Sequence, residues 1–86
     1  MPKTMYSWKH MDVRGENESV QTAPTGTLLK DVVRCRYFRF ITIVRDTSAG
    51  LCLQGEWLDD LGNVVLVQTQ HMRVLTEAEH LDLSKS

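Results

Sequence analysis

The run from Arg34 to Arg45 constrains the fold of this 86-residue chain more than any other stretch. It is the part of the sequence densest in β-branched and aromatic residues, which favour strands. An extended backbone would place Phe38, Phe40 and Val44 on one face and Tyr37, Ile41 and Ile43 on the other. Because both faces carry apolar residues, we expect a central strand over Arg36–Arg45 that is covered on both sides.

Two further strands are predicted after this run, each preceded by a turn-forming sequence. Leu51–Leu58 follows the polar turn at 46–50, and Val64–Val74 follows the turn at 59–63. We expect a hairpin register in which Leu58 lies opposite Val64, so that the apolar faces of the two strands coincide. Gly55 indicates a bulge or a large neighbouring side chain that lies over the backbone.

The N-terminal third is more polar. Residues 1–13 are expected to contain a short edge strand with Tyr6 and Trp8 on one face. Residues 15–26 contain Pro, two terminal Gly and few apolar residues, and we expect a mobile loop there. Residues 27–34 have apolar residues at helical spacing but are rich in Val. We favour a bent strand that continues into Arg36–Arg45.

The C-terminus carries a helix signal, since Thr76 and Glu79 have the spacing of a capping box. The whole chain is therefore expected to form a single small domain over residues 1–86. The predicted fold is mainly β, a small antiparallel meander or a partly open SH3-like barrel with a short C-terminal helix. The alternative is an α+β fold in which a helix over residues 25–34 packs on a three-stranded antiparallel sheet.

Composition restricts the class of protein. The formal net charge is −1, from 10 basic and 11 acidic residues, which argues against a dedicated non-specific nucleic-acid binder. We find no apolar signal-peptide core at the N-terminus and no apolar run near the roughly 18 residues of a membrane span. We therefore expect a cytoplasmic location, reduced cysteines and no membrane contact.

Candidate metal ligands and catalytic groups are sparse. His10, His71, His80, Cys35 and Cys52 do not occur at the close spacing of structural zinc sites. No histidine–nucleophile pair and no Gly-rich phosphate loop is recognisable. We therefore expect no cofactor and no metal, and enzymatic activity is not favoured.

The preferred functional hypothesis is a non-catalytic binding module that contacts another protein. Its surface is expected to use exposed aromatic residues and the basic strand, with Arg39 stacked on Trp57. A homodimer is as compatible with the sequence as a monomer. The candidate contact residues are Trp8, Arg34, Arg36, Tyr37, Arg39 and Trp57.

Two other hypotheses compete with the first. A small nucleic-acid-binding regulator would use the basic and aromatic strand over residues 34–45 to neutralise phosphates and stack bases. Its contacts would be Arg34, Arg36, Tyr37, Arg39 and Arg45. A small-ligand binder or enzyme would need a concave pocket near His71 or Asp60, at an oligomer interface.

Overall fold

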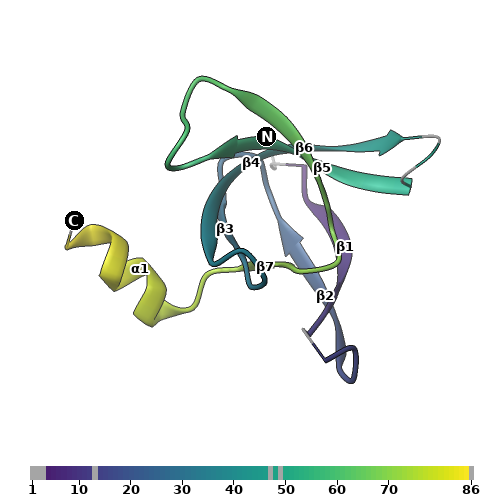
Figure 1. Cartoon of the computed structure of the whole chain (residues 1–86), viewed down its shortest axis with the longest axis horizontal. Coiled ribbons are helices and arrows are strands. Elements are labelled where there is room, and N and C mark those ends of the chain that lie inside the picture. Colours follow the sequence, from purple (N-terminus) through teal and green to yellow (C-terminus); the bar gives the residue numbers. More distant parts are fainter. Residues whose placement is uncertain (1–3, 13, 47, 49, 86) are drawn as a thin grey trace.

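The computed structural model describes residues 4–12, 14–46, 48 and 50–85, which form two antiparallel sheets and one helix. The strands are β1 (Tyr6–Met11), β2 (Glu18–Ala23), β3 (Leu28–Asp31), β4 (Arg36–Asp46), β5 (Gly50–Trp57), β6 (Val64–Gln68) and β7 (Met72–Val74), and the helix is α1 (Glu77–Ser84). β1 and β2 form a hairpin, and the other strands form a sheet in the order β6-β5-β4-β3-β7 (Figure 1). The mainly β fold with a short C-terminal helix is confirmed, and β4 is central. Within the described residues the five-stranded sheet does not close into a barrel.

The core lies between the hairpin and the five-stranded sheet. Phe40 of β4 is fully buried, and its ring contacts Tyr6 and Trp8 of β1 at centroid distances of 5.5 and 5.6 Å. The buried cluster comprises Trp8, Ala23, Leu29, Phe38, Phe40, Leu53, Trp57 and Met72. The N-terminal edge strand predicted from Tyr6 and Trp8 is therefore present, and it covers the sheet.

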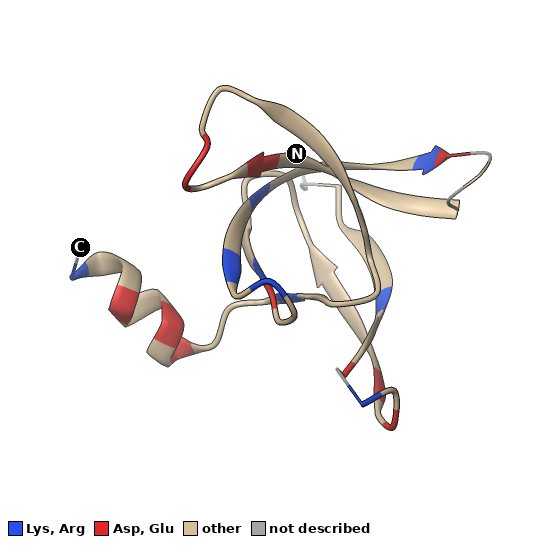
Figure 2. Cartoon of the chain, viewed as in Figure 1, with Lys and Arg blue, Asp and Glu red and all other residues tan. Residues whose placement is uncertain are grey.

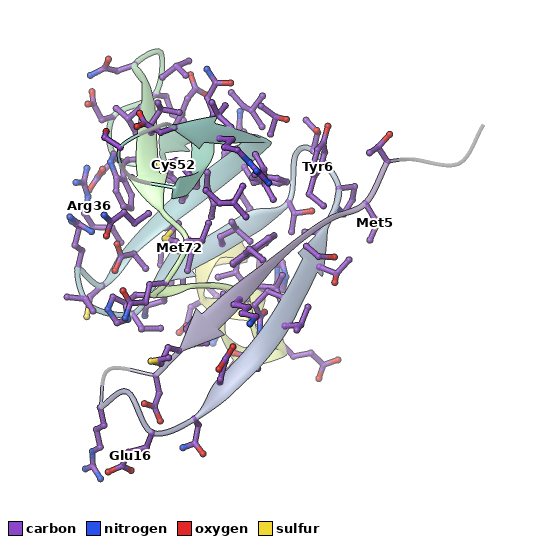
Figure 3. All side chains as sticks on the ribbon, turned by 90° about the vertical axis from the view of Figure 1, so that its right-hand side faces the viewer. Met5, Tyr6, Glu16, Arg36, Cys52 and Met72 are labelled. Atoms are coloured by element: carbon purple, nitrogen blue, oxygen red, sulfur yellow. The ribbon has the colours of Figure 1, made fainter. Side chains whose placement is uncertain are left out.

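Polar contacts attach the hairpin to β7 and to the turn before it. The Trp8 indole Nε1 donates to the Met72 carbonyl at 2.8 Å, in a buried position. The Val74 amide donates to the Gln21 side chain at 3.0 Å, which joins β7 to β2. Figure 3 shows Met72 within the body of the molecule and the hairpin tip, near Glu16, directed away from it.

The segment predicted as a mobile loop, residues 15–26, contains β2, so the loop assignment is wrong over residues 18–23. Its polar composition has a simple cause: the ribbon is two-stranded and its outer face is exposed, as Thr22 shows. Ser7 and Thr22 hydroxyls lie 3.2 Å apart across the ribbon. Only the inner face needs apolar residues, and there Ala23 is 1% exposed.

Residues 27–34 are neither the predicted continuous bent strand nor the alternative helix over 25–34. β3 ends at Asp31, and residues 32–35 form a tight turn into β4. The Asp31 carboxylate accepts hydrogen bonds from the amides of Val33 and Arg34, both at 2.9 Å. Cys35 takes a left-handed conformation with φ 56°. An Asp side chain thus organises a turn that contains no Gly or Pro.

A β-bulge in β4 overturns the predicted assignment of its two faces. The register with β5 shifts between Phe40 and Thr42, which inserts one residue into the strand. Beyond the bulge, Ile43 lies opposite Leu53 and packs against the core, a position that the sequence assigned to Val44. The run has apolar residues on both faces partly because the inward-facing positions switch at the bulge, and not only because both faces are covered.

The β5–β6 register differs from the predicted one by two residues. Gly55 lies opposite Val65, whereas the prediction placed it opposite Val67. A shift of two preserves the inward face, so the coincidence of apolar faces is retained. The prediction for Gly55 is confirmed, because a Cβ atom there would lie 2.7 Å from the Phe38 ring. The predicted strand Val64–Val74 is divided into β6 and β7 by a turn over residues 69–71.

Helix α1 extends away from both sheets (Figure 1). None of its residues is fully buried, and the predicted capping box of Thr76 and Glu79 is present. Glu79 also accepts two hydrogen bonds from Arg73 of β7, at 2.7 and 2.9 Å. Its carboxylate lies 3.5 Å from the ammonium of Lys30. The Glu79 carboxylate therefore links α1 to the sheet.

Candidate functional site

Two of the predicted contact residues are core residues. Trp8 is 3% exposed and Trp57 is 7% exposed, so the expectation that both offer exposed aromatic surface is wrong. The Trp57 ring packs edge to face on Phe38 at 5.2 Å between centroids. The guanidinium of Arg36 covers it at 4.3 Å from the ring centroid. Most of each indole therefore packs inside the molecule.

The stacking arginine is Arg36 and not Arg39, because of the register. Arg39 lies opposite Glu56 on the other face of the sheet, where it is exposed. Arg36 shares the inward face with Phe38 and reaches Trp57 at the end of the strand. Its guanidinium also donates to both oxygens of Asp59, at 3.1 and 2.5 Å, and these bonds lower the pKa of the Asp59 carboxyl.

Arg34 is held by the carboxylate that organises the β3–β4 turn. Its guanidinium donates to Asp31 at 2.8 Å while most of its side chain stays exposed. Burial of Asp31 is the largest influence on its pKa and opposes ionisation. The hydrogen bonds from Arg34 and Val33 together outweigh burial, so the pKa is lowered and the ion pair persists at neutral pH.

Tyr37 belongs to the polar cluster that carries α1. The Lys30 ammonium lies 5.1 Å from the centroid of the Tyr37 ring, and Lys30 also pairs with Glu79. Figure 2 shows acidic residues along α1 and basic residues around β3. Hydrogen bonds from Arg73 are the largest cause of the low pKa of Glu79, which falls to about 2. The carboxylate is therefore ionised at every physiological pH.

These contacts pair two of the four arginines of residues 34–45, and two further basic side chains beside them, with carboxylates of the same chain. Arg34, Arg36, Lys30 and Arg73 each pair with a carboxylate of the same chain. In the part of the chain that the structure describes, no ion pair involves Arg39, the remaining predicted contact residue. The predicted contact residues thus do not form one surface.

A polar cavity of about 210 Å³ lies between β6 and the β3–β4 turn. It is lined by Asp31, Arg34, Leu66, Val67, Gln68, Gln70 and His71. The cavity therefore lies beside His71, which is one of the two places where the small-ligand hypothesis expected a pocket. The His71 ring lies 3.3 Å from the Met11 carbonyl, so one of its nitrogens already faces the hairpin.

A larger and more apolar groove follows the outer edge of β1. Its volume is about 450 Å³, and it is lined by Ser7, Trp8, Lys9, Val20, Leu51 and Thr69. Val20 is 66% exposed and Leu51 is 41% exposed. Sequence reasoning missed this surface, because Val20 fell within the predicted loop at 15–26 and Leu51 within the predicted strand Leu51–Leu58. The signal was Val20 itself, an isolated β-branched residue in a polar segment.

Further candidates are weaker. The His10 ring is buried, and its Nδ1 has no hydrogen-bond partner among the residues that the structure describes. Burial is the largest cause of the lowered pKa of His10. Across the described residues, no three His, Cys, Asp or Glu side chains converge on a possible metal site. The described part of the chain also contains no helix long and apolar enough to cross a membrane.

Comparison with protein-family models, curated proteins and solved structures finds no significant match to this chain.

Proposed function

We propose that this chain is a non-catalytic protein-interaction module. The observation that carries the proposal is the groove along β1, where two large apolar side chains remain exposed. Val20 and Leu51 come from different sheets, and both border this one groove. Contiguous apolar surface at a concave site is a common mark of a protein-binding surface.

Charge placement supports a protein partner over nucleic acid. Phosphate binding depends on basic groups that are available to release counterions. Here Arg34 and Arg36 already have carboxylate partners in the same chain, at 2.8 and 2.5 Å. An incoming phosphate would have to displace these partners. Weak retention on heparin or DNA at low salt is the expected result.

The cavity near His71 is the second candidate binding site, because it is smaller and more polar than the groove along β1. Its volume of about 210 Å³ is below the roughly 300–1,000 Å³ of typical small-molecule sites. Its two charged residues, Asp31 and Arg34, bond to each other. The groove along β1, at about 450 Å³, falls within that range, and its apolar lining residues include Val20 and Leu51.

A pull-down from native host extract, with and without nuclease, tests the proposal. The wild-type chain is expected to recover a partner protein whose binding survives nuclease. The double variant Val20→Lys, Leu51→Lys should lose it, and Val33→Lys should retain it, because Val33 is 54% exposed but lies outside the groove. Recovery that depends on nucleic acid, or equal recovery by all variants, contradicts the proposal.

A further inference from the structure

The hydrogen-bond pattern of β1 determines which main-chain groups face the groove. At the end of the hairpin the Asp12 amide donates to the Asn17 carbonyl at 3.0 Å, across to the β2 side. The preceding amide, that of Met11, donates to the Gln70 carbonyl at 2.8 Å, on the opposite side. Hydrogen-bonded and non-hydrogen-bonded pairs alternate along an antiparallel ladder. The odd-numbered residues of β1 therefore point their main-chain groups away from β2.

Two of these residues, Ser7 and Lys9, lie beyond the contact with Gln70. Among the described residues, no hydrogen bond outside the hairpin engages their N–H or C=O groups. Residues two apart in a strand are separated by about 6.6 Å, which is the repeat on one edge of an antiparallel ladder. Such an unpaired edge is a template for another strand.

The groove lies beside this same edge. Ser7 and Lys9 line it together with Val20, Leu51 and Thr69. Lys9 is paired with Glu18 at 3.3 Å, but its side chain is 80% exposed, so it does not fill the groove. Main-chain donors and acceptors thus occur next to an apolar wall, which is the combination that an extended peptide uses for strand addition.

We infer that the free edge of β1 binds an extended segment of a partner protein as an additional strand, with apolar side chains at alternate positions. This inference rests on the proposed function and specifies its mode. The N–H and C=O groups of Ser7 and Lys9 pair with the backbone of that segment. Side chains on one of its faces contact Val20 and Leu51, so the preference for apolar residues recurs every second position.

A second copy of the chain fits this edge less well. If a second copy added its own β1 to this edge, its Trp8 would remain buried in its own core. The side chains of its Ser7, Lys9 and Met11 would then extend the outer face of the hairpin. Ser and Lys would then lie against Val20. A small molecule would contact the apolar wall but leave the repeated main-chain groups without partners.

The experiment uses a displayed library of linear random dodecapeptides selected on the full chain. Enriched peptides should carry apolar residues at every second position and should protect the Ser7 and Lys9 amides from hydrogen exchange. In the free chain these two amides should exchange faster than those of Trp8 and His10, which face β2. Two N-methylated forms of an enriched peptide are compared, one methylated at the odd positions and one at the even positions. One form should bind at least tenfold more weakly than the unmodified peptide, and the other should stay within twofold of it.

Matched variants distinguish the contribution of the β1 main chain to binding from the contribution of its side chains. Lys9→Pro removes an N–H that points away from β2, and Pro is tolerated at such positions of edge strands. It should lower affinity at least tenfold, whereas Lys9→Ala should stay within twofold of wild type. Val20→Lys should weaken binding and Val33→Lys should not. The N-methyl series gives an answer even where Lys9→Pro disturbs folding.

Several outcomes overturn the inference. Equal affinity for both N-methyl registers shows that backbone pairing is not used. Concentration-dependent self-association that Lys9→Pro abolishes identifies the occupant as a second copy. Absence of any enriched peptide, or unchanged amide exchange at Ser7 and Lys9 on binding, also overturns it. If the pull-down still recovers a nuclease-resistant partner in these cases, the proposed function stands and only the mode of binding fails.

Discussion

Glu79 is expected to control whether helix α1 stays folded. α1 has eight residues, none of them fully buried, and isolated helices shorter than about 12–15 residues are marginal in water. The side chain of Glu79, which is 13% exposed, completes the capping box and accepts two hydrogen bonds from Arg73. Glu79→Gln removes the negative charge that acts in the capping box and in the pair with Arg73. It should unfold α1 while the sheets remain folded.

The pKa of Glu79 gives the magnitude. A pKa lowered from 4.5 to about 2 corresponds to about 3 kcal/mol in favour of the ionised carboxylate in the folded chain. Because the folded pKa is the lower one, this stabilisation is complete above pH 4.5 and is lost as the pH falls towards 2. Wild-type α1 should therefore lose its structure within that interval.

Amide hydrogen exchange and NMR chemical shifts of α1 measure the effect, with Trp57 fluorescence as the reporter of the sheet. Glu77→Gln is the matched control, because Glu77 lies in the same first turn and forms no ion pair among the residues that the structure describes. Equal loss of α1 protection in both variants would refute the reasoning. Protection of α1 that persists below pH 2 in the wild type would refute it as well.

Three further predictions concern stability and are measured by urea unfolding. Gly55→Ala should cost about 1–3 kcal/mol or more, because the added methyl group would overlap the buried Phe38 ring and the main chain of β4. Cys35→Gly should change stability by no more than about 1 kcal/mol and in the stabilising direction, since φ is 56° there, whereas Cys35→Val should be destabilising. Trp8→Phe should cost at least about 1–3 kcal/mol, because it leaves the buried Met72 carbonyl without its donor. An unchanged unfolding midpoint in Gly55→Ala or Trp8→Phe, or a stabilised Cys35→Val, would contradict the corresponding argument.

The fold class and several elements were predictable from local pattern. The capping box needs only Thr76 and Glu79 at the right spacing, and both bonds form. Gly55 signalled a close approach, which the Phe38 ring makes. The alternation of apolar residues in β5 and β6 identified their inward faces, although the register differs by two residues, because loop length is not encoded in the alternation.

The errors arise where tertiary contacts determine local structure. The β4 bulge is stabilised from another segment, since the Thr25 hydroxyl donates to the Ile41 carbonyl at 2.5 Å. The turn before β4 depends on a buried carboxylate, that of Asp31, which looks like a surface residue in the sequence. The strand character of β2 follows from its pairing with β1. The edge strand at the N-terminus was predicted, but the groove beside it was not, because the groove results from how the hairpin joins the sheet.

The chain contains two tryptophans, one in each sheet, so that tryptophan fluorescence can follow the unfolding of each sheet separately. Trp8 belongs to the hairpin and Trp57 to the five-stranded sheet, and both are buried. They differ in their quenching groups, since the Arg36 guanidinium covers Trp57 while the Trp8 indole bonds to a carbonyl. Emission from Trp57→Phe follows detachment of the hairpin, and emission from Trp8→Phe follows the main sheet. Coincident transitions would show that the two sheets unfold as one cooperative unit.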